Sequence, residues 1–307
     1  MKTYRLAAWA LLALPFLANG VLADDAATAD QPAAGQAVQI VRDVPYLGKE
    51  RAEKLDLYLP PAAGKDLRYP GVVIIHGGGW TSGDKGAARE QNIGTTLAQA
   101  GYVCASINYL LSDQEDKIFP VRLAAVWPQN LYDCKTAVRF LRANADKYQI
   151  DVDHIGAIGG SAGGHLTGML GLTGPEDKLD PAGPYGEFSC RVQAIVPMYG
   201  PSDMVLFAKG RKFYDKLPPE QQALCVASSP VTYISDDDPP VLILHGTADA
   251  LVPVEQSQVL HDALIRAGHA SQIEIVPKAP HSFHLQPAQK DLRPLVLGFF
   301  DKHLQAQ

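Results

Sequence analysis

Cysteine is scarce in this sequence, and positive charge is nowhere concentrated. Only four of the 307 residues are cysteine, and charged residues make up 20% of the chain, with a formal net charge of −6. No cluster of lysine and arginine residues interrupts this acidic balance. Because nucleic acids and anionic membranes attract basic surfaces, we expect neither of them as a partner.

Sequence patterns that bind metal ions or nucleotide phosphates are also missing. The chain has no H-E-x-x-H, no G-K-[ST] after a glycine run, and no G-x-G-x-x-G that leads into a helix. His281 and His284 could bind a metal together, but no third ligand is evident for such a site. We therefore expect neither a metal ion nor a cofactor.

The N-terminal segment differs in composition from the rest of the chain. Two positive residues precede an apolar stretch over 6–17, and small residues then allow cleavage after Ala23. A membrane anchor is the alternative, but the apolar stretch is short and no stop-transfer charges follow it. We expect a signal peptide over 1–23, a flexible leader over 24–38, a single folded domain over 39–307, and export to the periplasm or the exterior.

The four cysteines fall into two pairs with different surroundings. Cys104 lies in an apolar run and Cys134 on the apolar stripe of a predicted helix, so we expect both to be buried core residues. Cys190 and Cys225 flank a region that we expect to be rich in loops. Since exported proteins can form disulfides, we expect a bond between these two, although counting cysteines does not determine their pairing.

Apolar runs alternate with amphipathic segments along the chain, and this alternation predicts the fold. Strands are expected at 39–44, 54–59, 71–75, 102–109, 155–158, 192–198, 241–244 and 272–276. Helices are expected at 95–100, 129–148, 255–267 and 289–304, and directly after the strand at 155–158. Segments 112–128 and 201–229 are expected to be irregular. The alternation predicts an α/β fold, with a mostly parallel sheet of about eight strands and helices on both faces.

The segment 159–163 reads Gly-Gly-Ser-Ala-Gly, which fits the nucleophile pattern G-x-S-x-G. An apolar run precedes it and helical spacing follows, so the serine stands on a sharp turn between strand and helix. Glycines suit such a turn because a Cβ would collide with neighbouring backbone. We take Ser161 as the candidate nucleophile; a plain strand–helix turn is the alternative. His165 is expected to pack beneath the site.

Two later loops supply a candidate acid and base. Asp249 and His281 follow the last two predicted strands, and the order Ser161, Asp249, His281 matches the α/β-hydrolase arrangement. His281 would act as the base, and Asp249 would orient its imidazole. His284 is a rival for the base. Asp249 could instead only cap a turn, and the acidic residues at 236–238 are poorer candidates because they precede their strand.

A glycine run after the third predicted strand completes the candidate site. Attack on an ester creates a negative oxygen, and backbone N–H groups that point at it lower the barrier. Only glycine lets the backbone approach so closely. We assign the oxyanion donors to Gly78 and Gly79, with Ala162 from the serine turn. A phosphate-binding loop is the alternative reading of the glycine run.

Together these motifs resemble those of exported esterases of the α/β-hydrolase superfamily. The resemblance covers roughly residues 40–305, and the chain is similar to the bacterial feruloyl and acetyl-xylan esterase-like group and its hormone-sensitive-lipase-like relatives. It rests on HGGGW (76–80) with SGD (82–84), NY (108–109), WPQNLYDCKTAVRFLRANADKY (127–148), GGSAGGHL (159–166), PPVLILHGTADALVP (239–253) and HSF (281–283).

The resemblance implies an α/β-hydrolase fold and the hydrolysis of acyl esters, of acetyl or feruloyl type, on carbohydrate or phenolic alcohols. The expected protein is a serine carboxylesterase whose substrate is a small-molecule or polysaccharide-linked ester. Two departures concern the pocket wall: Leu110 stands where the group often has arginine, and the connection over 112–126 is long. Alternatives are a lipase or peptidase on the same fold, or a non-catalytic ligand-binding protein on this scaffold.

Overall fold

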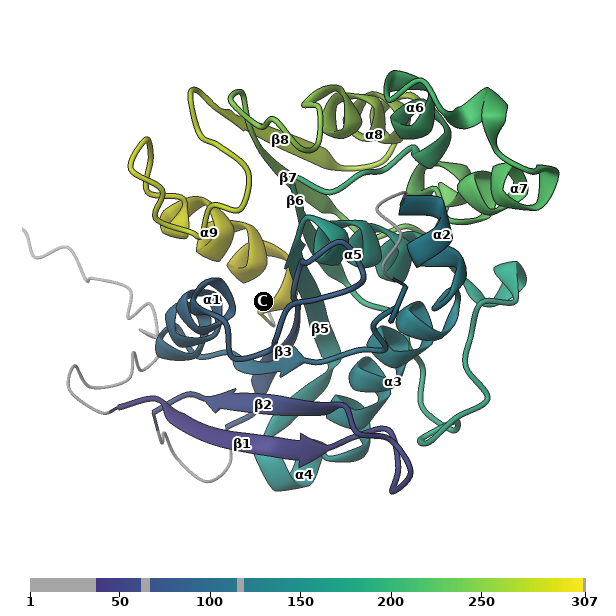
Figure 1. Cartoon of the computed structure of the whole chain (residues 1–307). Helices are drawn as coiled ribbons and strands as arrows, with labels where there is room; N and C mark the ends of the chain where they lie inside the picture. Colours follow the sequence, from purple (N-terminus) through teal and green to yellow (C-terminus); the bar gives the residue numbers. More distant parts are fainter. Residues whose placement is uncertain (1–36, 62–66, 115–118, 306–307) are drawn as a thin grey trace, which may run out of the picture.

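One sheet of eight strands runs through the residues that the computed structural model describes, which are 37–61, 67–114 and 119–305 (Figure 1). The expected signal peptide over 1–23, and nearly all of the expected leader over 24–38, lie outside these residues. The strands are β1 (Gln39–Pro45), β2 (Lys54–Leu59), β3 (Tyr69–Ile75), β4 (Val103–Ile107), β5 (Ile150–Gly160), β6 (Ala194–Met198), β7 (Val241–Gly246) and β8 (Ser271–Val276). All eight predicted strands are confirmed, with differences at their ends.

The strand order brings loops from distant parts of the sequence together. Across the sheet the order is β1-β2-β4-β3-β5-β6-β7-β8. The pairs β1–β2 and β2–β4 are antiparallel, and every later pair is parallel. Ile75 at the end of β3 lies opposite Gly159 near the end of β5. The loops after these strands therefore leave the same edge of the sheet side by side, at the carboxyl ends where such sheets bind ligands.

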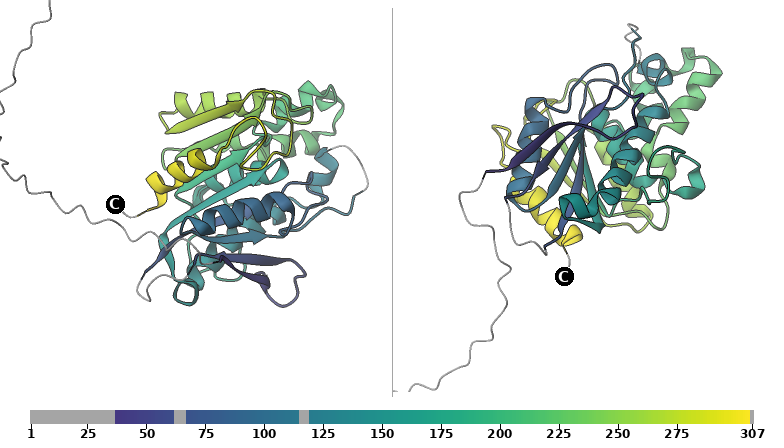
Figure 2. Two further views of the ribbon diagram at one scale, coloured as in Figure 1. Left: turned by 90° about the vertical axis from the view of Figure 1, so that its left-hand side faces the viewer. Right: turned by 90° about the horizontal axis from the view of Figure 1, so that it is seen from below.

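Helices cover both faces of the sheet (Figures 1 and 2). One face carries α1 (Ala88–Gln99) and α9 (Arg293–Leu304), and the other carries α3 (Gln129–Ala143), α5 (Ala162–Leu172) and α8 (Glu255–Arg266). Successive side chains of a strand point to opposite faces. In β3, Val72 packs beneath α1 and α9 and Val73 beneath the other helices, and both are fully buried. A continuous apolar run is therefore required for this central strand.

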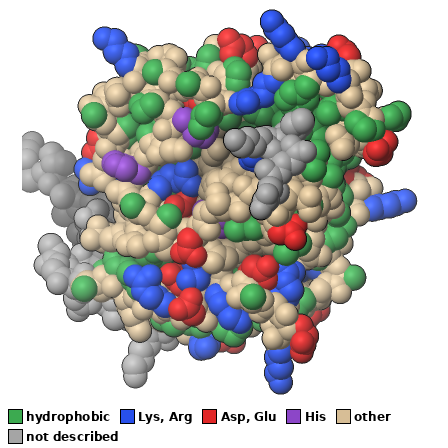
Figure 3. Space-filling view, in the orientation of Figure 1, with side chains coloured by type: hydrophobic (Ala, Val, Ile, Leu, Met, Phe, Trp, Pro, Cys, Tyr) green, Lys and Arg blue, Asp and Glu red, His purple; other side chains and the backbone are tan. Residues whose placement is uncertain are grey.

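Two segments that the sequence predicts to be irregular contain helices, so this expectation is wrong. They hold α2 (Phe119–Ala124), α6 (Met204–Gly210) and α7 (Pro219–Ala227). The prolines do not prevent these helices, because Pro120 and Pro219 stand in the first turn, where a missing N–H loses no bond. The Asp203 side chain caps α6 by accepting from the N–H of Leu206. Hydrophobic side chains gather on the surface over this part of the molecule (Figure 3).

The remaining helices differ from the prediction at their ends. α1 begins at Ala88, well before Thr95, and α9 begins at Arg293 instead of Gln289. The predicted helix over 129–148 is divided at Asn144 into α3 and the short α4 (Ala145–Tyr148). The described residues also include the 3₁₀ helices η1 (Pro175–Asp177), η2 (Tyr214–Lys216) and η3 (Pro230–Tyr233).

The expected disulfide is absent, because all four cysteines are free and buried. Cys190 precedes β6 and therefore lies toward the amino ends of the parallel strands, where its thiol contacts the Asp180 carboxylate at 3.2 Å. Cys225 lies on α7, which packs on α2 and α6 beyond the carboxyl ends of the strands. The two thiols therefore lie toward opposite ends of the strands. Among the described helices, none is both long and apolar enough to cross a membrane.

Candidate active site

The turn between β5 and α5 holds Ser161 at φ 60° and ψ −121°, a conformation that costs free energy in an L-residue. Its N–H donates to the carbonyl oxygen of Met198 at 3.0 Å, which ties the turn to β6. A Cβ at Gly163 would lie 2.0 Å from the carbonyl oxygen of Ile75, and one at Gly159 would lie 2.6 Å from the Gly163 oxygen. The predicted strand–turn–helix around Ser161 is confirmed, and close backbone approach explains its glycines.

The structure brings the three predicted catalytic side chains together. The Nε2 atom of His281 lies 2.8 Å from Ser161 Oγ, and its Nδ1 atom lies 2.6 Å from Asp249 Oδ2. His284, the rival base, is exposed, and its Nδ1 accepts from the N–H of Gln286. His281 is therefore the histidine that the loop after β8 presents to the serine, although both lie within one short loop.

The Asp249 carboxylate uses its two oxygens for two different purposes. Oδ1 accepts from the N–H groups of Leu251 and Val252, each at 2.8 Å, so the aspartate does cap the turn after β7. Oδ2 faces two imidazoles, His281 at 2.6 Å and His245 at 3.2 Å. Burial alone would raise the pKa of Asp249, but the hydrogen bonds from His245 and His281 outweigh it and hold the pKa well below its usual value. Asp249 therefore stays ionised.

His245, which the sequence reasoning did not single out, is a second histidine on the catalytic carboxylate. It is fully buried near the end of β7. Its Nε2 faces only acceptors, Asp249 and the carbonyl oxygen of Val252 at 3.0 Å, so this nitrogen carries a proton. Its Nδ1 lies 2.6 Å from Ser257 Oγ on α8. The sequence contains one signal for this residue, which is a histidine placed directly after the apolar run Val-Leu-Ile-Leu.

The glycine loop after β3 lies beside the serine, as the pairing of β3 with β5 requires. Gly78 and Gly79 line the same hollow as Ser161, at φ 121° and 61°. A Cβ at Gly78 would lie 1.9 Å from the carbonyl oxygen of Ser82, so only glycine fits there. Ala162 is the first residue of α5. Oxyanion binding by Gly78, Gly79 and Ala162 stays a prediction that this arrangement supports.

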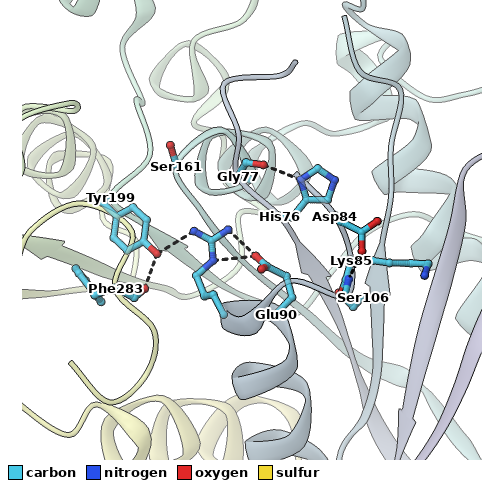
Figure 4. Close-up of polar contacts among 12 residues, drawn as sticks. His76, Gly77, Asp84, Lys85, Glu90, Ser106, Ser161, Tyr199 and Phe283 are labelled. Carbon is cyan, nitrogen blue, oxygen red and sulfur yellow. Dashed lines mark hydrogen bonds and ion pairs between the residues drawn. The ribbon is translucent and has the colours of Figure 1, made fainter. Parts of the chain in front are cut away.

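A partly buried polar chain lies below Ser161 in the view of Figure 4. The Arg89 guanidinium donates to Glu90 Oε1 through Nε at 2.8 Å and to the Tyr199 hydroxyl at 3.2 Å. That hydroxyl donates to the carbonyl oxygen of Phe283 at 2.6 Å, two residues after the base, and the Tyr199 ring meets the His281 ring edge-on at 5.0 Å. The chain thereby braces the His281 loop. The sequence reasoning missed these residues because nothing in their local pattern marks them.

Two other histidines near the serine are held neutral by burial. Burial lowers the pKa of His165 to about 4, and its Nε2 lies 2.7 Å from the carbonyl oxygen of Ser228. Burial likewise lowers the pKa of His76 to about 4, and its Nδ1 lies 2.7 Å from the Gly77 oxygen. The expectation that His165 packs under the site is confirmed.

The hollow above Ser161 has a volume of about 550 Å³, and aromatic rings form part of its wall. Phe119 is the central ring, with its centroid 5.2 Å from that of Phe207, 5.5 Å from Phe213 and 6.2 Å from Trp80. Phe119 and Phe207 belong to α2 and α6, the helices that the sequence did not predict. Within the described residues, no group of three or more histidine, cysteine, aspartate or glutamate side chains could hold a metal ion.

The strand order and the strained serine turn, with the aspartate and the histidine in loops after later strands, define the α/β-hydrolase fold. Comparison with known proteins agrees. The BD-FAE family model matches residues 55–264, which is most of the described sheet. The chain therefore belongs to the BD-FAE family.

Similar proteins carry related names. The probable carboxylic ester hydrolase LipM of Mycobacterium tuberculosis is 32% identical over 254 residues, or 79% of this chain and 56% of that protein. The esterase LipQ of the same organism is 29% identical over 256 residues, or 79% of this chain and 57% of that protein. This chain thus spans little more than half the length of these relatives. A solved truncated form of a carbohydrate esterase from gut microbiota has a TM-score of 0.74 and 28% identity, covering 89% of this chain and 99% of that one.

Proposed function

We propose that this chain is a serine carboxylesterase that works through an acyl-enzyme. The observation that carries the proposal is the hydrogen-bonded path from Ser161 Oγ through His281 to Asp249, with steps of 2.8 and 2.6 Å. A serine hydroxyl becomes an effective nucleophile when an adjacent imidazole accepts its proton during the attack. The names of the similar proteins, which are ester hydrolases, support the same type of reaction.

In the first half of the proposed reaction, Ser161 Oγ bonds to the acyl carbon while its proton passes to His281 Nε2. The bond between that carbon and the alcohol oxygen breaks, and His281 gives the proton to the leaving alcohol. In the second half, water attacks the acyl carbon, His281 takes its proton, and Ser161 leaves with that proton as the acid departs. Asp249 stabilises the imidazolium in both halves.

Negative charge forms on the former carbonyl oxygen in each half-reaction. We assign its stabilisation to the backbone N–H groups of Gly78, Gly79 and Ala162. The position of the glycine loop in the wall of the hollow, next to Ser161, supports this assignment. Backbone donors of this kind act without reorganisation, so they stabilise the transition state more than the ground state.

The proposed substrates are esters of short acyl groups, of acetyl or feruloyl type, which a plant polysaccharide could carry. A hollow of about 550 Å³ is far larger than an acetyl group needs. Its wall of Phe119, Phe207 and Phe213 offers ring faces on which an aromatic acyl group could stack. These features favour the feruloyl type over the acetyl type.

A panel of esters tests the proposal. The wild-type chain and Ser161→Ala would be assayed on acetylated xylan, methyl ferulate and p-nitrophenyl esters of increasing chain length. We expect turnover of short-chain or feruloyl esters by the wild type and none by the variant. A preference for long acyl chains would replace this assignment by that of a lipase. If a fluorophosphonate failed to label Ser161, the serine mechanism would be rejected.

A further inference from the structure

Positive side chains surround the candidate active site of a chain whose net charge is −6. Arginines from three separate segments line the hollow above Ser161, and none of its described lining residues is an aspartate or a glutamate. The three are Arg89, Arg122 and Arg211. A concave site lined by one sign of charge attracts ligands of the opposite sign.

Arg211 differs from Arg89 in the way its charge is satisfied. Arg89 is bonded to the buried carboxylate of Glu90. Arg211 follows the last residue of α6 and donates to the backbone carbonyl of Leu251, while its guanidinium carbon lies 4.6 Å from the centre of the Phe207 ring. Among the described residues it forms no ion pair. A carbonyl oxygen does not neutralise a cation, so Arg211 keeps its charge and several unused N–H donors.

Arg211 stands where two hollows meet. It lines the active-site hollow, and it also lines a second hollow of about 340 Å³, whose wall includes the apolar residues Leu206 and Pro253 and the acidic residue Glu255. Phe207 and Leu251 line both hollows as well. In Figure 3, hydrophobic and basic side chains lie close together on the upper part of the face, over α6. A substrate that extends beyond the first hollow would therefore pass this guanidinium.

We propose that Arg211 binds a carboxylate on the ester substrate, remote from the scissile carbonyl, and so gives the site a preference for anionic esters. The proposal rests on the esterase function proposed above. A guanidinium is planar and binds a carboxylate through two parallel hydrogen bonds. The guanidinium lies over the ring of Phe207, and this contact restricts its motion before binding, which lowers the entropy lost on binding. Leu206 and Leu251, both exposed, would contact the carbon chain that joins the carboxylate to the ester.

Two pairs of esters test the proposal, one for each side of the scissile bond. On the alcohol side, 4-acetoxybutanoate is compared with its neutral amide, and on the acyl side, monomethyl adipate is compared with its monoamide. We expect the wild type to show a higher kcat/KM for the carboxylate than for the amide in at least one pair. The pair that shows the preference identifies the side on which the carboxylate lies.

Arg211→Gln should lower kcat/KM for the preferred carboxylate by about five- to tenfold, while the amide changes by less than about twofold. Arg211→Lys should retain part of the preference, because it keeps the charge but loses the two-bond geometry. Lys212→Gln is the matched control, since Lys212 is the next residue and lines neither hollow. Added salt should weaken the preference, as for any partly exposed charge pair.

The proposal is wrong if the wild type shows no carboxylate preference in either pair, if Arg211→Gln affects carboxylate and amide equally, or if Lys212→Gln has the same effect as Arg211→Gln. Thermal unfolding of each variant shows whether the fold is retained. Turnover of p-nitrophenyl acetate by the wild type tests the esterase function separately from the role of Arg211. Without that turnover and without Ser161 labelling the esterase function itself fails, whereas turnover without a carboxylate preference overturns only the role of Arg211.

Discussion

The floor of the hollow and its cap are built in different ways. The floor consists of Ser161, Asp249 and His281 with the glycine loop, and each of its parts follows a β-strand. The cap consists of α2, α6 and α7, which pack on one another beyond the strand ends, with ring contacts such as Phe119 on Phe207. Backbone hydrogen bonds of the sheet position the floor, and side-chain packing positions the cap. We therefore expect floor substitutions to change kcat and cap substitutions to change the choice of substrate.

The largest effect is expected at the nucleophile. Ser161→Ala removes the atom that forms the covalent bond, so kcat should fall by a factor on the order of 10⁴–10⁶. The melting temperature should change little, because the turn is held by backbone contacts such as the bond to Met198. Residual activity above about one part in 10³ would show that the floor does not work as the geometry indicates.

The next largest effect should come from the glycine loop of the floor. Gly78→Ala would drive a Cβ to within 1.9 Å of the carbonyl oxygen of Ser82, so the loop must move and its N–H groups lose their aim. We expect kcat to fall by about 10²–10³. Gly101→Ala is the matched control, because Gly101 also has a positive φ, of 94°, but has no atom within 4 Å of the added Cβ. The control should cost about 1 kcal/mol of stability and no activity.

His245 tests whether support beneath the floor matters for the reaction. In His245→Gln the amide nitrogen can still donate to Asp249, whereas in His245→Asn it reaches only toward Ser257. A lost hydrogen bond to a charged group is worth about 1.5–3 kcal/mol, so His245→Asn should lower kcat by roughly 10–100-fold and His245→Gln by less than about fivefold. KM should not change, because His245 does not line the hollow. If both variants lost the same share of kcat while remaining equally stable, the hydrogen bond from His245 to Asp249 would have no part in the reaction, and His245 would have only a structural role.

Acidic pH should lower the stability of the fold through the buried histidines near Ser161. His165 has a pKa of about 4 in the folded protein and about 6.5 when unfolded, so between these values only the unfolded state binds the proton. The free energy of unfolding should therefore fall as the pH falls from 6.5 to 4, by about 1.4 kcal/mol per pH unit from this histidine. His165→Gln should reduce the loss between pH 7 and 5.5 measured by urea unfolding. Burial lowers the pKa of His76 to about 4 as well, so part of the loss of stability should remain in the His165→Gln variant.

The smallest effect is expected in the cap. Phe213→Leu keeps most of the volume of the side chain but removes a ring that lies 5.5 Å from Phe119 in the wall of the hollow. We expect KM for an aromatic acyl ester to rise by about three- to tenfold, with kcat unchanged and acetyl esters unaffected. A fall in kcat for both kinds of ester would show that the cap and the floor are not separable.

Much of the floor could be predicted from short stretches of sequence. A buried strand is recognisable as an apolar run, and the residues that follow it must lie at the carboxyl edge of the sheet. Ser161, Asp249 and His281 were found in this way, and the structure brings them within hydrogen-bonding distance. The sequence favoured His281 over His284 as the base but did not decide between them, because two histidines three residues apart have the same local context.

The cap and the supports could not be predicted from the same patterns. Helices α2, α6 and α7 are short and begin near proline, so their sequence resembles that of a loop until packing stabilises them. The bond expected between Cys190 and Cys225 was wrong for a related reason, since the count of cysteines contains no information on the end of the sheet toward which each one lies.

By itself, the sequence determined the strands, the serine turn and the order of the candidate catalytic residues, because strand periodicity and turn chemistry act between near neighbours in the chain. Only the tertiary structure decided that His245 shares Asp249 with His281, that the Arg89 chain braces the base, and that Arg211 lies over Phe207 where the two hollows meet. These contacts join residues from different elements. Their distances depend on how whole layers pack, and no local pattern records that packing.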